Sequence, residues 1–272
     1  MPDIERYRAS EQEKARTADL LGVLPKGRAT VLDVGARDGF FSKLLTECFV
    51  SVTALDLEKP SFDYPGVVTV AGDVTKLDFA DHSFDCVFCT EVLEHVRDVK
   101  VACRELIRVA RHEIVIGVPF QQDIRVGRMT CGACGGITPP WGHVNSFREK
   151  DLLELFHECR VISKSFVGTS TEATNALSTI LMDLAGNPWG TYDDELKCLH
   201  CGFSLNAPRG KRTLVSKISS ALALRIDRVQ ALWTRPHSNW IHFVFAKQPG
   251  ISEKSPFREC SYSMIVGQKD NK

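Results

Sequence analysis

Three side chains of the kinds that bind metal ions stand close together after an apolar run. They are Glu91, Glu94 and His95, in the segment 89–96. If this segment enters a helix, the spacing i, i+3 and i+4 places all three on one helix face. Two carboxylates beside an imidazole repel one another unless a positive charge lies between them, and a divalent cation would supply it. The alternative is a histidine that only packs or hydrogen-bonds.

Two cysteine pairs share the pattern C-x-x-C-G. They are Cys131 with Cys134 and Cys198 with Cys201. The two-residue gap lets both thiolates reach one tetrahedral ion, and the glycine permits the positive φ that turns backbone N–H groups toward sulfur. Free buried cysteines and a redox dithiol are the alternatives, but a redox dithiol needs only one pair. The duplication favours one structural zinc ion.

A glycine-containing turn follows the first apolar run of the chain. Residues 31–40, VLDVGARDGF, contain an apolar strand, a turn with Gly35 and Gly39, and a helix start. At the carboxyl ends of parallel strands such a turn lets a ligand approach backbone N–H groups. A phosphate-binding or NAD-binding turn has a similar composition, so the turn alone does not identify the ligand.

Acidic residues at the ends of the following apolar runs limit which ligand the turn can bind. Asp56 ends the second run, where a carboxylate can accept both ribose hydroxyls of an adenosyl group. Asp73 follows the third run and Asp85 opens the fourth. NAD enzymes rarely show this series, which therefore favours another adenosyl ligand. The alternative is that each acid only caps a turn.

This part of the chain resembles the class I S-adenosylmethionine (SAM)-dependent methyltransferases, whose first motif reads roughly D-x-G-x-G-x-G. Arg37 stands where the middle glycine usually lies. The resemblance covers about residues 29–168 and the last strand. It implies a doubly wound, Rossmann-like α/β fold with seven strands, the last one antiparallel. It also implies that SAM is held by Asp33, Gly35, Ala36, Gly39, Asp56, Leu57, Asp73 and Val74.

A later histidine, His143, precedes an amphipathic stretch at 148–158. Together with E-x-x-E-H it resembles metal-dependent O-methyltransferases of the ubiquinone-pathway and small-RNA 2′-O-methyltransferase types. By this resemblance, Mg²⁺ or another divalent ion would be held by Glu91, Glu94, His95 and His143. The ion would lower the pKa of an acceptor hydroxyl and orient it. Without a metal, His143 would be the first candidate for general base and His95 the second.

Alternating strands and helices must position these groups. Strand-like runs lie at 29–34, 51–56, 67–71, 84–89, 114–118 and 161–167. Helix-like stretches lie at 5–22, 40–48, 91–109 and 149–158. This alternation predicts a mainly parallel sheet with helices on both faces. No convincing strand appears in 169–238, and 239–248 is expected to be the final strand.

The same pattern predicts the domain organisation. Residues 1–168 and 239–248 form the expected methyltransferase domain, and 249–272 a flexible tail. Residues 169–238 form an insertion before the last strand, a lid that zinc clamps to the 119–147 loop.

The insertion contains a basic amphipathic stretch within 209–235. Its cations are Lys211, Arg212, Lys217, Arg225, Arg228 and Arg235. Such a stretch suits a peripheral membrane contact, a phosphorylated carrier or RNA. The plainer alternative is a lid helix with a solvated charged face.

The composition excludes several classes of protein. The chain has 272 residues, 43% hydrophobic and 25% charged, which excludes the disordered and fibrous classes. Lys+Arg 34 balances Asp+Glu 34, which disfavours a nucleic-acid binder. Ten cysteines and no visible secretory signal indicate a reducing compartment, so a cytoplasmic location is expected.

These observations together predict SAM-dependent methyl transfer to a hydroxyl of a small molecule or sugar. One alternative is 2′-O-methylation of RNA. The other is a zinc-stabilised, non-catalytic binding module, for which Arg37 in the glycine turn is the best support. The acceptor and the oligomeric state stay open.

Overall fold

The computed structural model describes residues 4–208 and 210–247, which fall into two compact units. The sheet unit comprises Glu11–Pro119, Phe147–Gly168 and the described residues from Trp240 on. The cysteine unit comprises the described residues up to Ser10, Phe120–Ser146 and Thr169–Asn239. Each unit is described by itself below. The predicted tail lies outside the described residues, and the lid role of 169–238 stays a prediction.

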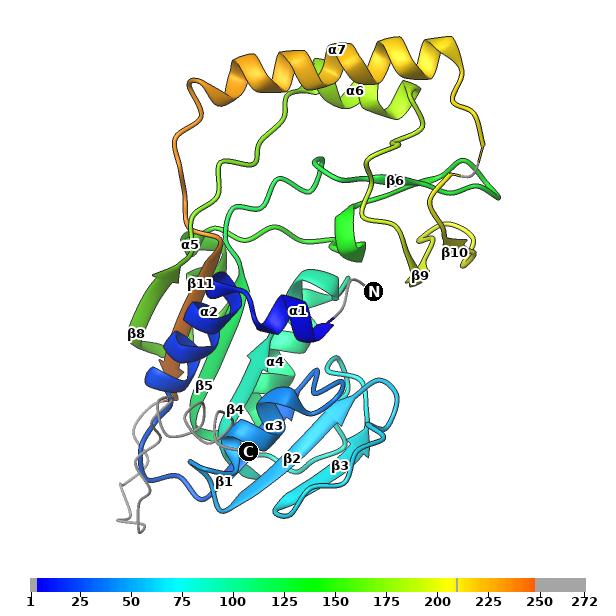
Figure 1. The fold of residues 1–272 in the computed structure, drawn as a ribbon. Helices are drawn as coiled ribbons and strands as arrows, with labels where there is room; N and C mark the ends of the chain where they lie inside the picture. The colour runs from blue at the N-terminus through cyan, green and yellow to red at the C-terminus, as the bar shows by residue number, and fades with distance from the viewer. Residues whose placement is uncertain (1–3, 209, 248–272) are drawn as a thin grey trace, which may run out of the picture. The chain divides into compact units, whose positions relative to one another are not determined.

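A seven-stranded mixed sheet organises the sheet unit in the order β3-β2-β1-β4-β5-β11-β8 (Figure 1). The first five strands of this order pair in parallel, whereas β11 runs antiparallel to both β5 and β8. The predicted antiparallel last strand is thus confirmed. The strands are β1 Thr30–Val34, β2 Ser51–Asp56, β3 Val67–Ala71, β4 Phe84–Thr90, β5 Ala110–Pro119, β8 Arg160–Val167 and β11 Trp240–Ala246.

Helices cover both faces of this sheet. They are α2 Glu11–Gly22, α3 Phe40–Leu45, α4 Val99–Val109 and α5 Glu149–Leu155, with a 3-10 turn, η1, at Leu93–His95. Leu20 of α2 and Leu45 of α3 belong to one buried cluster with Phe88 of β4. On the other face, Phe156 at the end of α5 stacks on Phe245 of β11 at 4.6 Å between ring centroids.

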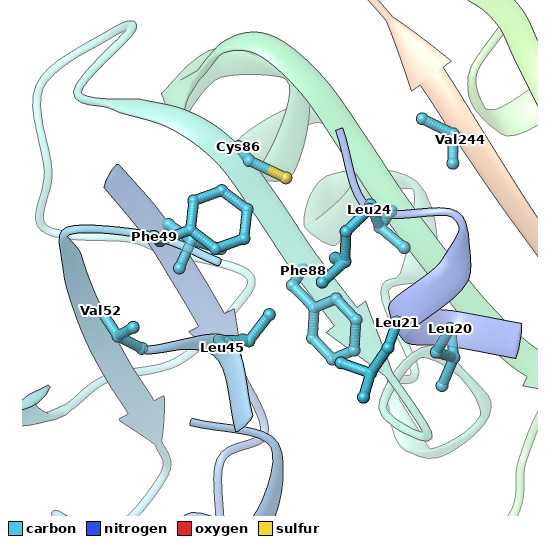
Figure 2. Packing of buried hydrophobic residues seen from close by; sticks show 11 residues of the cluster. Leu20, Leu21, Leu24, Leu45, Phe49, Val52, Cys86, Phe88 and Val244 are labelled. Atoms are coloured by element: carbon cyan, nitrogen blue, oxygen red, sulfur yellow. The ribbon is translucent and has the colours of Figure 1, made fainter. Parts of the chain in front are cut away.

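The core on the α2 and α3 face is continuous across the sheet (Figure 2). Its members are apolar residues that alternate along the strands with those of the other face, as a sheet covered on both sides requires. They are Leu20, Leu21, Leu24, Val31, Leu45, Phe49, Val52, Cys86, Phe88, Val115 and Val244. This packing fixes the loops at the carboxyl ends of β1, β2 and β4.

Two helix predictions are wrong. The expected helix at 91–109 begins only at Val99, because the Glu91 amide still donates to the Gly117 carbonyl of β5 and Glu91 has a positive φ of 57°. The expected helix at 5–22 is interrupted, giving α1 Ile4–Arg8 in the cysteine unit and α2 in the sheet unit. Apolar spacing continues across both interruptions, so it does not reveal them.

Two short hairpins and two longer helices make up most of the cysteine unit. β6 Met129–Thr130 pairs with β7 Ile137–Thr138, and β9 Asp193–Lys197 pairs with β10 Ser204–Leu205. The expectation of no strand within 169–238 is therefore wrong. The sequence of β9, DDELK, has no apolar alternation by which to recognise a strand.

The remaining elements of the cysteine unit are helical. They are η2 Pro140–Gly142, α6 Ala176–Leu184 and α7 Leu214–Ala231. The two longer helices lie side by side (Figure 1). Among the described residues, none of the helices has both the length and the apolar composition needed to cross a bilayer.

Candidate functional site

The turn after β1 is shaped by two glycines with left-handed backbone. Gly35 has φ +79° and Gly39 has φ +78°. A Cβ on Gly35 would lie 2.2 Å from Cγ2 of Val92, and a Cβ on Gly39 would lie 2.3 Å from the Phe62 ring. The amides of Gly35 and Ala36 donate to the Leu55 carbonyl at 2.8 and 3.0 Å. The turn is thus tied to the end of β2 and needs glycine at both positions.

Arg37 also adopts the left-handed conformation, with φ 48°. This explains why the resembling family has glycine there, since an L-residue is strained in this region. Its amide donates to Asp56 Oδ2 at 2.8 Å, and the Leu57 amide donates to Asp56 Oδ1 at 2.7 Å. Both oxygens of Asp56 therefore bind backbone N–H groups, and the carboxylate connects the glycine turn to the end of β2.

Asp33 lies inside the sheet just before the turn. It is 3% exposed and accepts a hydrogen bond from Ser42 Oγ at 2.5 Å. Burial raises the pKa of this carboxyl to about 7, although the Ser42 hydrogen bond acts in the opposite direction. The negative charge of Asp56 adds to the increase. Asp33 is therefore an internal polar group that ties β1 to α3.

Asp73 follows β3 by two residues and is exposed. Its Oδ1 accepts hydrogen bonds from the Thr75 amide and hydroxyl, at 2.8 and 2.7 Å, while the next residue, Val74, is buried. Asp85 is different. It accepts hydrogen bonds from the amides of Ala29 and Thr30. These groups lie at the amino ends of β4 and β1, at the edge of the sheet opposite the glycine turn. Asp85 is therefore structural.

The acidic segment after β4 does not form the predicted helix face. Glu91 precedes the 3-10 turn, Glu94 lies within it at 1% exposure, and His95 is exposed. A carboxylate oxygen of Glu94 and a ring nitrogen of His95 lie within 4.8 Å of each other, in a potential metal-binding group that excludes Glu91. The single-face prediction is wrong because a turn of three residues cannot present positions i, i+3 and i+4.

Glu94 is a buried carboxylate whose side-chain oxygens lack hydrogen-bond partners among the described residues. Burial raises the pKa of Glu94 well above its usual range, and the nearby Glu91 carboxylate adds to the shift. Such groups are rare in folded proteins and call for an explanation, such as a bound ion or a catalytic role.

A buried arginine lies beside these acids and was not expected from the sequence. Arg16 of α2 is 5% exposed and donates two hydrogen bonds to Glu13, at 2.8 and 2.6 Å. Its Nη1 lies 3.8 Å from Glu91 Oε1. Burial raises the pKa of Glu91, while the Arg16 charge acts against that shift. The one feature of the sequence that could have indicated this buried arginine is a Glu and an Arg three residues apart on a helix that also carries core leucines.

His143 belongs to the cysteine unit, unlike the other three predicted ligands. It is 6% exposed, and its Nδ1 lies 2.5 Å from Gln122 Oε1. This contact holds the ring through Nδ1. The predicted convergence of His143 with Glu91, Glu94 and His95 stays a prediction.

The four cysteines meet within the cysteine unit. Their sulfur atoms lie within 4.8 Å of one another. Each pair sits at the tip of a hairpin, Cys131 and Cys134 between β6 and β7, Cys198 and Cys201 between β9 and β10. The Cys131 amide donates to the Gly136 carbonyl at 2.9 Å. The Cys198 amide donates to the Phe203 carbonyl at 2.8 Å. The two hairpins thus repeat one knuckle conformation.

The predicted glycines complete both knuckles. Gly135 and Gly202 have φ +69° and +72°. The amides of Gly136 and His200 donate to the sulfurs of Cys134 and Cys198, both at 3.4 Å. His200 contacts the Ile137 carbonyl through Nε2 at 3.1 Å, so it is not one of the ligand group.

Sulfur spacing in this cluster fits a tetrahedral ion. The Sγ atoms of Cys131 and Cys201 are 3.7 Å apart, as are those of Cys134 and Cys198. Four thiolates at about 2.3 Å from a central zinc would be separated by about 3.8 Å. Burial opposes ionisation of Cys198, yet the amides of His200 and Cys201 hold its pKa to about 6. The residues present therefore fit zinc.

Comparison with known sequences finds matches within the sheet unit. Residues 32–115 match the family described as methyltransferase domain. Over 98 residues the chain is 37% identical to a demethylmenaquinone methyltransferase of Renibacterium salmoninarum. That match covers 34% of this chain and 40% of the relative, so the chain spans less than half the length of that relative.

Solved structures share the fold. A protein classed as a methyltransferase from Bacillus halodurans C-125 superposes with a TM-score of 0.55 at 14% identity, covering 85% of this chain and 98% of the other. The N-methyltransferase NodS of Bradyrhizobium japonicum WM9, in complex with S-adenosyl-L-homocysteine, gives 0.50 at 17%, covering 62% and 85%. The fold is thus the α/β methyltransferase fold with a seven-stranded mixed sheet, and residues 32–115 match the family described as methyltransferase domain.

Proposed function

We propose that this protein is a SAM-dependent methyltransferase acting on a small molecule. The observation that carries the proposal is the pairing of Asp56 with the glycine turn, where both carboxylate oxygens face backbone amides at the ends of β1 and β2. A carboxylate fixed there can also accept ribose hydroxyls, because each oxygen has a second lone pair. The match of residues 32–115 and the NodS complex support SAM as the methyl donor.

Calorimetric titration of the full chain with SAM and with S-adenosylhomocysteine tests the donor site. We expect both to bind, and Gly35→Ala to abolish binding, because its Cβ would meet Val92 at 2.2 Å. Gly22→Ala is the matched control, since a Cβ there meets nothing within 4 Å. No binding of either ligand by the wild-type chain would end the proposal.

We further propose that the acceptor is a hydroxyl of a small molecule or sugar, activated at Glu94. The support is the buried carboxylate that lacks a hydrogen-bond partner among the described residues and lies near a ring nitrogen of His95. It would take the hydroxyl proton directly, or hold a divalent ion with His95 and, as the sequence predicted, His143. Such an ion would supply a lower hydroxyl pKa and a fixed orientation toward the methyl group.

A second candidate acceptor is a quinone carbon. The name of the Renibacterium relative points to methylation of demethylmenaquinone, which favours this reading. Loss of a ring hydroxyl proton raises the electron density at the neighbouring ring carbon, so Glu94 would serve this reaction too. NMR of the product made with labelled SAM separates the two, because O-methyl and C-methyl carbons have different chemical shifts.

The base and the metal are tested together on whichever acceptor is methylated, with RNA among the acceptors tried. If a divalent ion takes part, Glu94→Gln, His95→Ala and His143→Ala should each lose activity while keeping SAM affinity. Mild chelation should then act reversibly. If His143 is a metal-free base, activity should survive chelation and be lost in His143→Ala. Full activity of Glu94→Gln would contradict the role given to that residue.

We also propose that Cys131, Cys134, Cys198 and Cys201 hold a structural zinc ion. The tetrahedral sulfur spacing and the repeated knuckle conformation support it. The ion would link two hairpins that are distant in sequence. It lies within the cysteine unit and takes no part in the methyl-transfer chemistry proposed above.

A further inference from the structure

The helix pair α6 and α7 exposes an unusual number of large apolar side chains. Eight of them belong to α7 and the two residues after it, and they are between 38% and 77% exposed. They are Leu214, Val215, Ile218, Leu222, Leu224, Val229, Leu232 and Trp233. On α6, Leu177, Ile180 and Leu184 are 56%, 62% and 63% exposed. Contiguous apolar surface of this kind marks an interaction site.

The buried residues of the two helices are small ones. Ser219, Ser220 and Ala223 are the buried residues of α7, and Ser178 is the buried residue of α6. Ser178 Oγ donates to the Ala223 carbonyl at 3.3 Å, and Ser216 Oγ donates to the Ala185 carbonyl at 2.8 Å. The helices therefore approach closely through small polar side chains.

This arrangement is the reverse of a helix pair that packs in water. In water, large apolar side chains are buried between helices and polar ones face outward. In lipid, small residues line the contact, hydroxyl groups hydrogen-bond across it, and large apolar residues face the hydrocarbon. The α6–α7 pair follows the second pattern. Its outer surface is thus better matched to acyl chains than to water.

The charges of α7 indicate which kind of lipid this surface would bind. Lys217, Arg225 and Arg228 are exposed. The one acidic residue of α7, Asp227, accepts a hydrogen bond from Thr174 Oγ1 at 2.9 Å. On α6, the one acidic residue is Asp183, which pairs with Arg128. Because Arg128 neutralises Asp183, three cations and the one carboxylate of Asp227 remain, and the net charge of the pair is positive in a chain whose Lys+Arg 34 and Asp+Glu 34 balance.

Helical periodicity places these cations beside the apolar residues. Leu214, Ile218 and Leu222 repeat every four residues on one side of α7. Lys217 and Arg228 project from the adjacent side, where their long stems allow the charge to reach the headgroups while the apolar residues enter the acyl region. A cationic border along an apolar stripe is the pattern of helices that lie in the membrane interface.

We propose that the α6–α7 pair is a docking surface for a membrane containing anionic lipid, with α7 lying along the bilayer surface. Apolar residues would supply insertion, and the cations would supply preference for anionic headgroups. This inference does not depend on the methyl-transfer proposal. It would place the protein where lipid-soluble acceptors are concentrated.

Co-sedimentation of the full chain with lipid vesicles tests the proposal. We expect the protein to pellet with vesicles of phosphatidylglycerol and phosphatidylcholine in equal parts, and to stay in solution with phosphatidylcholine alone. The double variant Ile218→Glu, Leu222→Glu should stay in solution with both. The matched control is Val50→Glu with Val68→Glu, which changes two valines of the sheet unit that are 76% and 58% exposed, and should still pellet.

A second variant tests the charge without changing the apolar surface. Lys217→Gln with Arg225→Gln and Arg228→Gln should weaken binding about a hundredfold, since each basic residue near an anionic surface contributes about fivefold. Circular dichroism and melting curves check that every variant folds. If the double glutamate variant unfolds, the charge variant alone decides the matter.

Three outcomes would overturn the proposal. The first is a wild-type chain that stays in solution with anionic vesicles. The second is a double glutamate variant that pellets as well as the control. The third is a wild-type dimer in light scattering that the glutamate variant dissociates, without vesicle binding, which would assign this surface to a second copy of the chain. Failure to bind SAM with vesicle binding intact would contradict the proposed function only.

Discussion

Asp56 has two tasks at the residue scale. It holds the glycine turn through the amides of Arg37 and Leu57, and it is the proposed acceptor of the ribose hydroxyls. We expect Asp56→Asn to weaken SAM binding by about 1.5–3 kcal/mol, because a charged acceptor is replaced by a neutral one with a single acceptor oxygen. Isothermal titration measures this loss. Asp78→Asn, which alters an exposed carboxylate of the same unit, should bind like the wild type.

Arg37 allows a sharper separation of backbone from side chain. Because its φ of 48° suits glycine and its amide binds Asp56, we expect Arg37→Gly to keep SAM affinity. Arg37→Pro should lose it, since proline has no N–H and its φ is fixed near −65°. Titration of the two variants side by side gives the answer. Loss of binding in Arg37→Gly would instead assign the guanidinium a direct role.

Asp33 predicts how stability depends on pH. Its pKa rises from 3.8 to about 7 on folding, so between these values the folded chain holds a proton that the unfolded chain has released. Stability supplied by this group is therefore present at low pH and lost as pH rises toward 7, by up to about 1.4 kcal/mol per pH unit.

Urea unfolding of the wild type and of Asp33→Asn, from pH 5 to pH 8, tests this sign. The stability of the asparagine variant relative to the wild type should rise with pH and level off above about 7, because asparagine has no proton to lose. A constant difference between the two proteins across this range would show that Asp33 does not titrate on folding.

At the scale of elements, the cysteine hairpins are too short to be stable alone. β6, β7 and β10 have two residues each. An isolated hairpin is marginal in water even with longer strands, so the fold of these segments depends on the proposed ion. We expect about one equivalent of zinc in the purified protein, and a lower melting temperature after strong chelation.

Cys134→Ser should reproduce the effect of chelation, because it removes one of the four thiolates. Cys159→Ser, a partly exposed cysteine of the sheet unit, is the matched control and should retain both the metal and the melting temperature. Metal analysis by mass spectrometry and calorimetric melting provide the readouts. A zinc-free preparation that melts like the wild type would count against the site.

How well the sequence predicted these elements depended on the signal in each one. The strands Ser51–Asp56 and Val67–Ala71 were predicted with the observed bounds, because an apolar run ends there at polar residues. Both cysteine knuckles followed from their spacing. The break after β4 did not, since the bond from the Glu91 amide to Gly117 joins residues that sequence periodicity cannot relate.

For the molecule as a whole, the sequence predicted the sheet better than the acid site. The donor residues follow strand ends, and strand ends are visible as the limits of apolar runs. Arg16 was missed because it reaches Glu91 from a helix at the start of the chain. In the sequence, Glu13 and Arg16 look like an ordinary ion pair on the surface of a helix. In the structure, both side chains are buried and hydrogen-bonded to each other.

The position of β11 has a consequence for synthesis of the chain. Of the strands in the described residues, β11 is the last to be made, yet it lies between β5 and β8. Until Trp240–Ala246 leaves the ribosome, β5 is an open edge and β8 lacks its one neighbour in the sheet. The nascent chain must therefore carry an exposed edge while all of Thr169–Asn239 is translated. The sheet is therefore completed only after Trp240–Ala246 has been made, and until then the growing chain depends on whatever shields that edge from other chains.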